Sequence, residues 1–124
     1  MNRAADRYLY AVQILKERYP CVRSVDVAHY LGISKPSVSA FIRQMREEGL
    51  METEADGNLL LTEEGRQRVM QLGTRIEFFC QLLRDAGVRP ELALKDAISF
   101  SWKMSEESFE AFHTMARNQT DHLL

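Results

Sequence analysis

The stretch "HYLGISKPSVSAFI", residues 29–42, decides how this chain folds. Gly32 and Pro36 stand close together between two segments whose apolar spacing favours helices. Glycine takes up left-handed backbone that a residue with a Cβ resists, and proline fits the first turn of a helix, where its missing N–H costs nothing. Because Ser34 is a good N-cap, we predict one helix that ends at Gly32 and a second that begins directly after Ser34.

The residues on either side extend this helix-turn-helix in both directions. Before the glycine, "VDVAHYL" predicts a short helix over residues 25–31, capped by Ser24. Its expected inward-facing side chains are Val25, Ala28 and Leu31. After the turn, the second helix is expected to run to about Glu48. Its expected buried side chains are Val38, Phe41, Ile42 and Met45.

A short β-hairpin and further helices are expected around this motif. Hydrophobic residues alternate at 50–53 and again at 59–61, on either side of the Asp56-Gly57 turn signal, which favours a hairpin. The helices expected outside the motif lie at residues 3–19, between Thr62 and Gly87, at about 90–103 and, capped by Ser105, at about 106–117.

This order of elements is typical of a winged helix-turn-helix, in which the second helix of the motif enters the major groove of DNA. We therefore predict a mainly α-helical protein. An N-terminal winged helix-turn-helix DNA-binding domain is expected over residues 1–65, and a C-terminal helical dimerisation domain over residues 66–124.

The start of the second helix carries residue types that can read DNA. The N-terminal residues of a recognition helix reach base edges. Serine hydroxyls donate or accept hydrogen bonds, alanine and proline touch a thymine methyl, and lysine reaches guanine or a phosphate. The base-reading candidates are Lys35, Pro36, Ser37, Ser39 and Ala40, and the cap residue Ser34 is a further DNA-binding candidate. The candidates for holding backbone phosphates are Arg23, Ser24, Arg43, Gln44 and Arg46.

The formal net charge of −2 gives no global basic signal, so charge has to be judged locally. Residues 16–46 carry mostly cations, whereas the segment from Glu47 to Asp56 is acidic. Such a division suggests an oriented contact with a polyanion, although solvated helix faces give the same pattern. Acidic residues in the expected hairpin would repel phosphate. This leaves a second interpretation open, a protein-interaction module that dimerises without reading DNA.

Other functional classes find little support in the sequence. It contains no G-x-S-x-G, phosphate-loop or H-E-x-x-H motif, so we do not expect an enzyme. Glu106, Glu110 and His113 share a helical face that could hold a metal ion, but such a face is more often simply solvated. No apolar run approaches the roughly 20 residues that span a bilayer. Cys21 and Cys80 are expected to be free thiols in a reducing cytoplasm.

The whole chain resembles the iron- and manganese-dependent repressor family (DtxR/MntR), in its short form without an SH3-like third domain. The resemblance rests on "YLYAVQIL", "VDVAHYLGISKPSVSAFIRQMREEGL", "LLLTEEGRQ" and "MSEESFEAF". It implies a homodimer whose N-terminal winged helices bind pseudo-palindromic operators in double-stranded DNA, and whose C-terminal helices pair the protomers. It also implies that manganese or iron, bound at the junction of the domains, permits DNA binding.

The family's metal ligands do not carry over to this chain. The positions that the resemblance assigns to them hold Arg7, Tyr10, Ile76, Ile98, Ser101 and Trp102. None of these is a carboxylate, imidazole or thiol, and a transition metal needs several such donors. A shift of one residue would offer Asp6, Glu77 or Asp96 but would break the apolar register of each helix. We therefore predict that the metal site is absent.

Two hypotheses explain what these positions do instead. The first is an apolar plug that fixes the two domains, formed by Tyr10, Ile76, Ile98 and Trp102. Burial of such side chains is worth about 1.5–3 kcal/mol each. The second is a pocket for a small anionic or aromatic effector, lined by Arg7, Tyr10, Ser101 and Trp102. The plug requires fewer assumptions.

Overall fold

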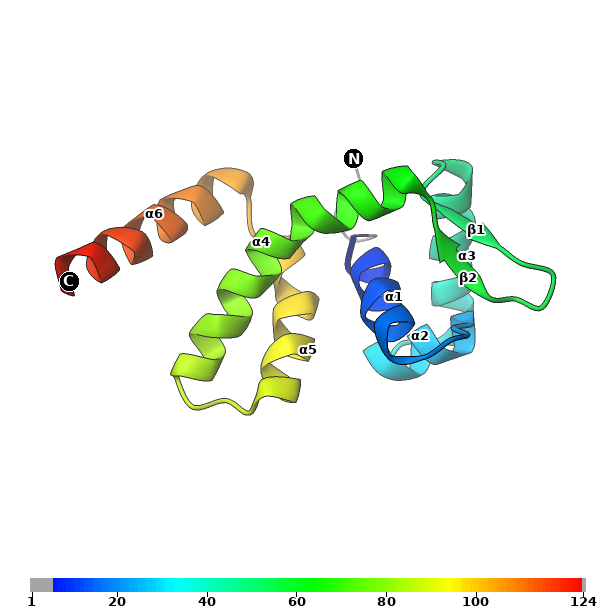
Figure 1. Ribbon diagram of the computed structural model, residues 1–124, viewed down its shortest axis with the longest axis horizontal. Coiled ribbons are helices and arrows are strands. Elements are labelled where there is room, and N and C mark those ends of the chain that lie inside the picture. The colour runs from blue at the N-terminus through cyan, green and yellow to red at the C-terminus, as the bar shows by residue number, and fades with distance from the viewer. Residues whose placement is uncertain (1–5, 124) are drawn as a thin grey trace. The chain divides into compact units, whose positions relative to one another are not determined.

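The computed structural model describes residues 6–123, with side chains up to residue 119. The chain divides into two compact units, one up to Thr74 and one from Arg75 onward. The division falls inside the long helix α4, Glu63–Asp85. Figure 1 labels the elements of both units. No helix among the described residues is long and apolar enough to cross a membrane.

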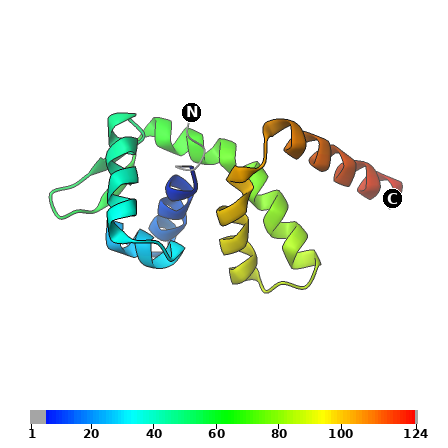
Figure 2. The ribbon, with the colours of Figure 1, turned by 180° about the vertical axis from the view of Figure 1, so that it is seen from behind.

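The first unit is a winged helix-turn-helix, as the sequence predicts. Its elements are α1 (Asp6–Arg18), α2 (Ser24–Leu31), α3 (Lys35–Glu47), β1 (Met51–Thr53), β2 (Leu59–Leu61) and the start of α4. The strands pair antiparallel, with Met51 opposite Leu61 and Thr53 opposite Leu59. In Figures 1 and 2 this hairpin, the wing, extends away from the helices of its unit.

The core of this unit lies between α1, α2 and α3. Leu9, Val12, Val27, Val38 and Met45 are all fully buried there. The ring of Tyr8 stacks on that of Phe41, with 4.2 Å between centroids. Of the side chains expected to be buried in α3, Val38, Ile42 and Met45 are buried and Phe41 is half-buried.

One core prediction for α2 is wrong. Val25 is 43% exposed, and Val27 is buried in its place beside Ala28. The buried stripe of α2 passes through Val27, Ala28 and the half-buried Leu31, which lie within one helical turn of each other. Val25 points away from this stripe, since each residue turns the helix by about 100°.

The turn and its caps form largely as expected. Gly32 has a φ of 68°, in the left-handed region that favours glycine. The Ser34 hydroxyl oxygen accepts a hydrogen bond from the Ser37 N–H at 3.3 Å, so Ser34 caps α3. Ser24, however, is the first residue of α2 and not its cap. Arg23 occupies the cap position, and its N–H donates to the Asp26 carboxylate at 2.8 Å.

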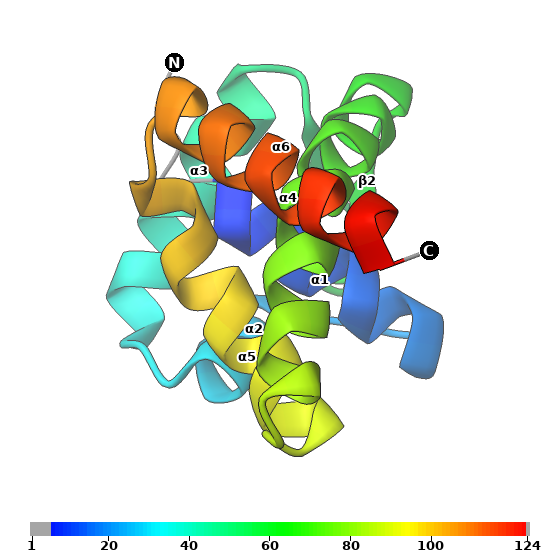
Figure 3. The same ribbon diagram turned by 90° about the vertical axis from the view of Figure 1, so that its left-hand side faces the viewer.

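The second unit holds the rest of α4, then α5 (Pro90–Phe100), the 3-10 turn η2 (Ser101–Lys103) and α6 (Glu106–Leu123). Figure 3 shows these helices from a second direction. Ser105 caps α6 by accepting from the Ser108 N–H at 3.1 Å, as expected. The helix runs beyond residue 117, where the sequence suggested that it would end, because no glycine or proline follows to stop it.

Aromatic side chains and one buried arginine hold the second unit together. Phe79 packs edge-on against Phe100, and Phe109 lies close to both Phe78 and Phe79. Arg75 donates to the carbonyl oxygens of Ser101 at 3.0 Å and Met104 at 2.6 Å, and its guanidinium lies 4.8 Å from the Phe109 ring centre. A single residue of α4 therefore fixes the segment that joins α5 to α6.

Candidate nucleic-acid interface

The first turns of α3 present polar and small side chains to solvent. The exposed residues there are Ser34, Lys35, Pro36, Ser37, Ser39 and Ala40, which include all of the base-reading candidates. The Ser34 hydroxyl donates to the Ser37 hydroxyl at 2.8 Å. Ser34 and Ser37 therefore present two hydroxyl groups, joined by a hydrogen bond, on the same exposed part of the helix as Lys35. Because Val38 and Ile42 face the core, the exposed side of α3 is not needed for packing within the unit.

The phosphate-binding candidates of α3 lie further along the helix. Arg43 and Arg46 are exposed and line an open hollow of about 610 Å³ between α3 and β1. The other lining residues are Glu47, Met51, Glu52 and Thr53. Gln44 is half-buried, and its amide donates to Glu48 at 3.3 Å. The hollow therefore combines two guanidinium groups with one carboxylate from the wing, Glu52, and one from the end of α3, Glu47.

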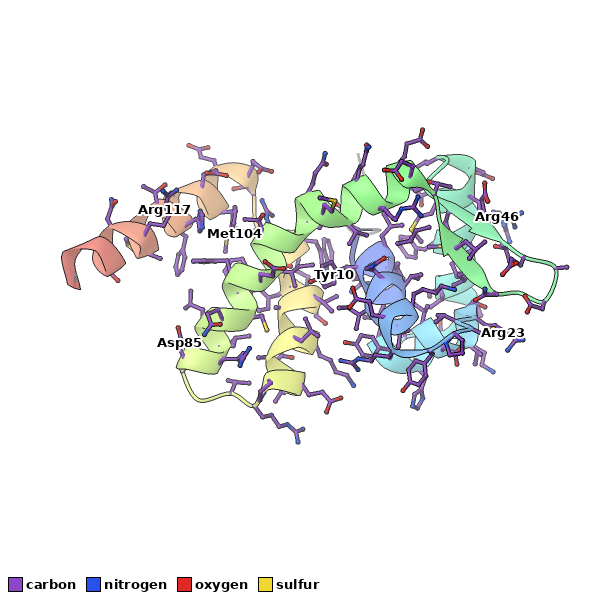
Figure 4. The ribbon with its side chains drawn as sticks, viewed as in Figure 1. Tyr10, Arg23, Arg46, Asp85, Met104 and Arg117 are labelled. Carbon is purple, nitrogen blue, oxygen red and sulfur yellow. The ribbon has the colours of Figure 1, made fainter. Side chains whose placement is uncertain are left out.

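Arg23 lies apart from the α3 candidates and is bound to the wing. Its Nε donates to the main-chain oxygen of Asp56 at 2.8 Å, and one of its terminal nitrogens lies 4.0 Å from the Asp56 carboxylate. In Figure 4, Arg23 and Arg46 lie on opposite sides of the hairpin. Ser24, the residue after Arg23, is half-buried in the first turn of α2.

Asn58 is a residue of this region that sequence reasoning missed. It is buried, and its side-chain oxygen accepts from the Val22 N–H at 2.9 Å and from Lys16 Nζ at 3.2 Å. Its amide nitrogen donates to Glu54 at 2.6 Å, and its main-chain N–H donates to the Asp56 carboxylate at 2.9 Å. The carboxylates of Glu54 and Asp56 were expected only to repel phosphate. They also accept hydrogen bonds that stabilise the hairpin. The Asp56-Gly57 signal indicates this turn, but nothing local in the sequence indicates the bond to Val22.

The six positions that the resemblance assigns to the family's metal ligands hold no carboxylate, imidazole or thiol. Tyr10, Ile76, Ile98 and Ser101 are buried, and Arg7 and Trp102 are half-buried. Arg7 donates to the Tyr8 hydroxyl at 3.2 Å.

Nearby acidic residues do not form a ligand set either. Asp6 is buried and pairs with Arg68 at 2.9 Å, while Glu77 and Asp96 are exposed. The ring of His113 packs against Phe78 and Phe109. It does not come together with Glu106 and Glu110 as a set of metal ligands. Within the part of the chain that the structure describes, no three His, Cys, Asp or Glu side chains come together.

Comparison with known proteins decides the family. Residues 1–59 match the family model described as "Iron dependent repressor, N-terminal DNA binding domain". The transcriptional regulator MntR of Escherichia coli O6:H1 is 31% identical over 107 residues, which cover 86% of this chain and 69% of that protein. The chain belongs to the iron- and manganese-dependent repressor family. MntR of Salmonella typhimurium is 30% identical over 90 residues, covering 73% of this chain and 57% of that protein.

Solved structures of this repressor family share the fold. IdeR of T. acidophilum aligns with a TM-score of 0.70 at 22% identity, over 92% of this chain and 53% of that one. A manganese-dependent transcriptional repressor in complex with manganese gives a TM-score of 0.69 at 24% identity, over 94% and 51%. The chain therefore spans about half the length of these two proteins.

Whether manganese or iron can bind at the six assigned positions depends on the side chains that this chain has there. A divalent transition metal needs several carboxylate, imidazole or thiolate donors. The six positions offer a guanidinium, a phenol, a hydroxyl, an indole and two isoleucines. Their chemistry does not fit manganese or iron at the place where the family resemblance puts it.

Proposed function

We propose that this repressor-family member is a sequence-specific DNA-binding transcriptional regulator that acts as a homodimer, most simply a repressor. The observation that carries the proposal is the exposed first part of α3. Lys35 and the serines beside it face solvent with no packing role, at the end of the helix that reaches base edges in a helix-turn-helix.

Base reading is assigned to residues 35–40 of α3. Arg43 and Arg46, which are exposed guanidinium groups on the same helix, hold backbone phosphates together with Gln44. Arg23 and Ser24 add a contact at the first turn of α2, where helix N–H groups favour an anion. Phosphate contacts of this kind fix the register of the protein on DNA, and base contacts give specificity.

Dimerisation is assigned to the second unit. Phe112 and Met115 of α6 are 37% and 50% exposed, and Leu82 of α4 is 39% exposed. Apolar side chains of this size usually find a partner surface when they gather on one helix. In a two-fold symmetric dimer the recognition helices bind half-sites about one DNA turn apart.

We further propose that DNA binding by this protein does not depend on manganese or iron. The support is the donor set, which lacks carboxylate, imidazole and thiolate at all six positions of the family's ligands. In its simplest form, this proposal includes no small-molecule effector in place of the metal. Buried Ile76 and Ile98 act as ordinary core residues of their helices.

A second candidate function is a protein-interaction module that dimerises without reading DNA. The acidic wing favours it, because the exposed side chains of Glu52, Glu54 and Asp56 oppose phosphate. A lost DNA surface would leave no salt-dependent binding to nonspecific duplex at low salt, whereas a regulator retains it.

The deciding experiment is fluorescence anisotropy of the purified protein on duplexes that tile the region upstream of its own gene. Each titration is run with manganese or iron, and again with a chelator. We expect tight binding that is unaffected by the chelator. Binding that appears only with metal would contradict metal independence. Absence of binding in both conditions would favour the interaction module.

A further inference from the structure

The wing turn is attached to the start of α2 by one side chain. Arg23 Nε donates to the main-chain oxygen of Asp56 at 2.8 Å. The methylenes of the same side chain lie against Gly57, since a Cβ built on that glycine would be 3.6 Å from Arg23 Cδ. The N–H of Arg23 donates in turn to Asp26 at 2.8 Å, which fixes the backbone from which the side chain extends.

This attachment uses a feature that only arginine has. The Nε–H of a guanidinium points sideways from the side chain, while the two terminal nitrogens extend beyond it. With Nε on the turn, one terminal nitrogen of Arg23 lies 4.0 Å from the Asp56 carboxylate, and the side chain as a whole is 51% exposed. Arg23 can therefore hold the turn through one nitrogen and approach a phosphate with another, whereas a lysine has a single nitrogen for both contacts.

The base of the wing is attached separately. Asn58 binds the Val22 N–H, and the main-chain N–H of Leu59 donates to the Val22 oxygen at 2.8 Å. The part of the hairpin beyond this anchor is the acidic turn from Glu54 to Gly57. Its position relative to α2 thus depends on Arg23, because the hydrogen bonds that Asn58 makes to Glu54 and Asp56 lie within the hairpin.

We propose that Arg23 is a positioning residue for DNA binding. Through Nε it holds the turn Asp56-Gly57 beside the start of α2, and it thereby keeps the acidic turn away from the phosphates that α3 binds. The role of the contact in DNA binding rests on the proposed function above, but the contact itself is a property of the free protein.

Amide hydrogen exchange of the free protein tests the contact. We expect Arg23→Lys and Arg23→Ala to speed exchange at Gly57 and Asn58 by about fivefold, the factor expected for one lost hydrogen bond. Arg18→Lys, a charge-conserving change at an exposed arginine of α1, is the matched control and should leave both amides unchanged. Equal exchange in wild type and Arg23→Lys would overturn the proposal.

DNA titrations over a range of salt test the consequence. Arg23→Lys should weaken binding by about fivefold and keep the salt slope of the wild type, because the charge remains. Arg23→Ala should weaken binding at least as much and lower the slope by about 0.9, the contribution of one phosphate. Arg18→Lys should bind as the wild type does.

A change in the turn itself separates positioning from direct contact. Gly57 has a φ of 90°, so Gly57→Ala strains the turn without altering any charge. We expect this variant to weaken binding about as much as Arg23→Lys, and the double variant to be no weaker than either alone. Full affinity in Arg23→Lys, or losses that add in the double variant, would overturn the positioning role. If the wild type bound no duplex, the proposed function would fail, while hydrogen exchange would still decide whether Arg23 holds the turn.

Discussion

At the scale of single residues, the proposed function gives α3 two tasks along its length. Ser37 stands at the exposed start of the helix and shares a hydrogen bond with Ser34, whereas Arg43 stands two turns later beside the hollow next to β1. A hydroxyl reads donors and acceptors on a base edge, and a guanidinium mainly neutralises phosphate. The two residues should therefore respond differently to truncation.

Replacement of Ser37 by alanine should change sequence preference. Loss of a hydroxyl contact costs about 1 kcal/mol at the base pairs that it reads and little elsewhere. The measurement is the affinity for a set of duplexes with single base-pair changes across each half-site. An equal loss on every duplex would argue against base reading by Ser37.

Replacement of Arg43 by alanine should weaken binding to all duplexes alike. One lost phosphate contact lowers the slope of log K against log salt by about 1. The salt dependence of binding measures this, and Arg89→Ala, an exposed arginine at the start of α5, is the control with the same loss of charge. An unchanged slope in Arg43→Ala would remove this residue from the phosphate set.

At the scale of elements, each unit contains a polar residue that links elements far apart in the sequence. Local sequence patterns do not indicate this role. In the second unit this residue is Arg75, which is only 8% exposed. It satisfies the carbonyl oxygens of Ser101 and Met104 and lies 3.4 Å from the Glu106 carboxylate. Because these acceptors belong to η2, to the residue that follows it and to the start of α6, Arg75 sets where α6 begins relative to α4.

Arg75→Lys should lower the free energy of unfolding by about 2 kcal/mol. A lysine keeps the charge but cannot donate to two carbonyl oxygens and a carboxylate from one planar group, and hydrogen bonds from charged donors contribute about 1.5–3 kcal/mol each. Urea denaturation measures the change, with Arg84→Lys as an exposed control on the same helix. A variant as stable as the wild type would show that Arg75 does not hold this segment.

At the scale of the whole molecule, the proposed function depends on how two copies of the chain would present their recognition helices. The first unit offers the DNA-facing side of α3, and the second unit offers the exposed apolar residues of α6. A regulator built in this way loses operator affinity when it cannot dimerise, since each half-site is then bound alone.

Met115→Glu should therefore separate the dimer and weaken operator binding at least tenfold, because it places a charge on an apolar surface that a partner copy would cover. Sedimentation velocity measures the dimer, and anisotropy measures the operator complex. Arg117→Glu, a charge change at an exposed residue of the same helix, is the control. A variant that remained dimeric would exclude this face of α6 from the interface.

The local sequence by itself determined most of the first unit. Gly32, Ser34 and Pro36 place the turn between α2 and α3 because their backbone preferences and capping act within a few residues. The same local rules correctly place the hairpin around Asp56-Gly57 and the start of α6 at Ser105. The exposed candidates on α3 follow from helical periodicity, which puts Val38 and Ile42 inside.

Only the tertiary structure decided which polar groups meet across long stretches of chain. Arg23 was expected at a phosphate and is bound to the wing turn, and Asn58 links the wing to Val22 through contacts that no local pattern encodes. Val25 and Val27 have equal propensity for helix, so the packing of α2 alone selected Val27 for the core. Hydrogen-bond partners far apart in sequence are set by the fold, which brings them together after the local elements have formed.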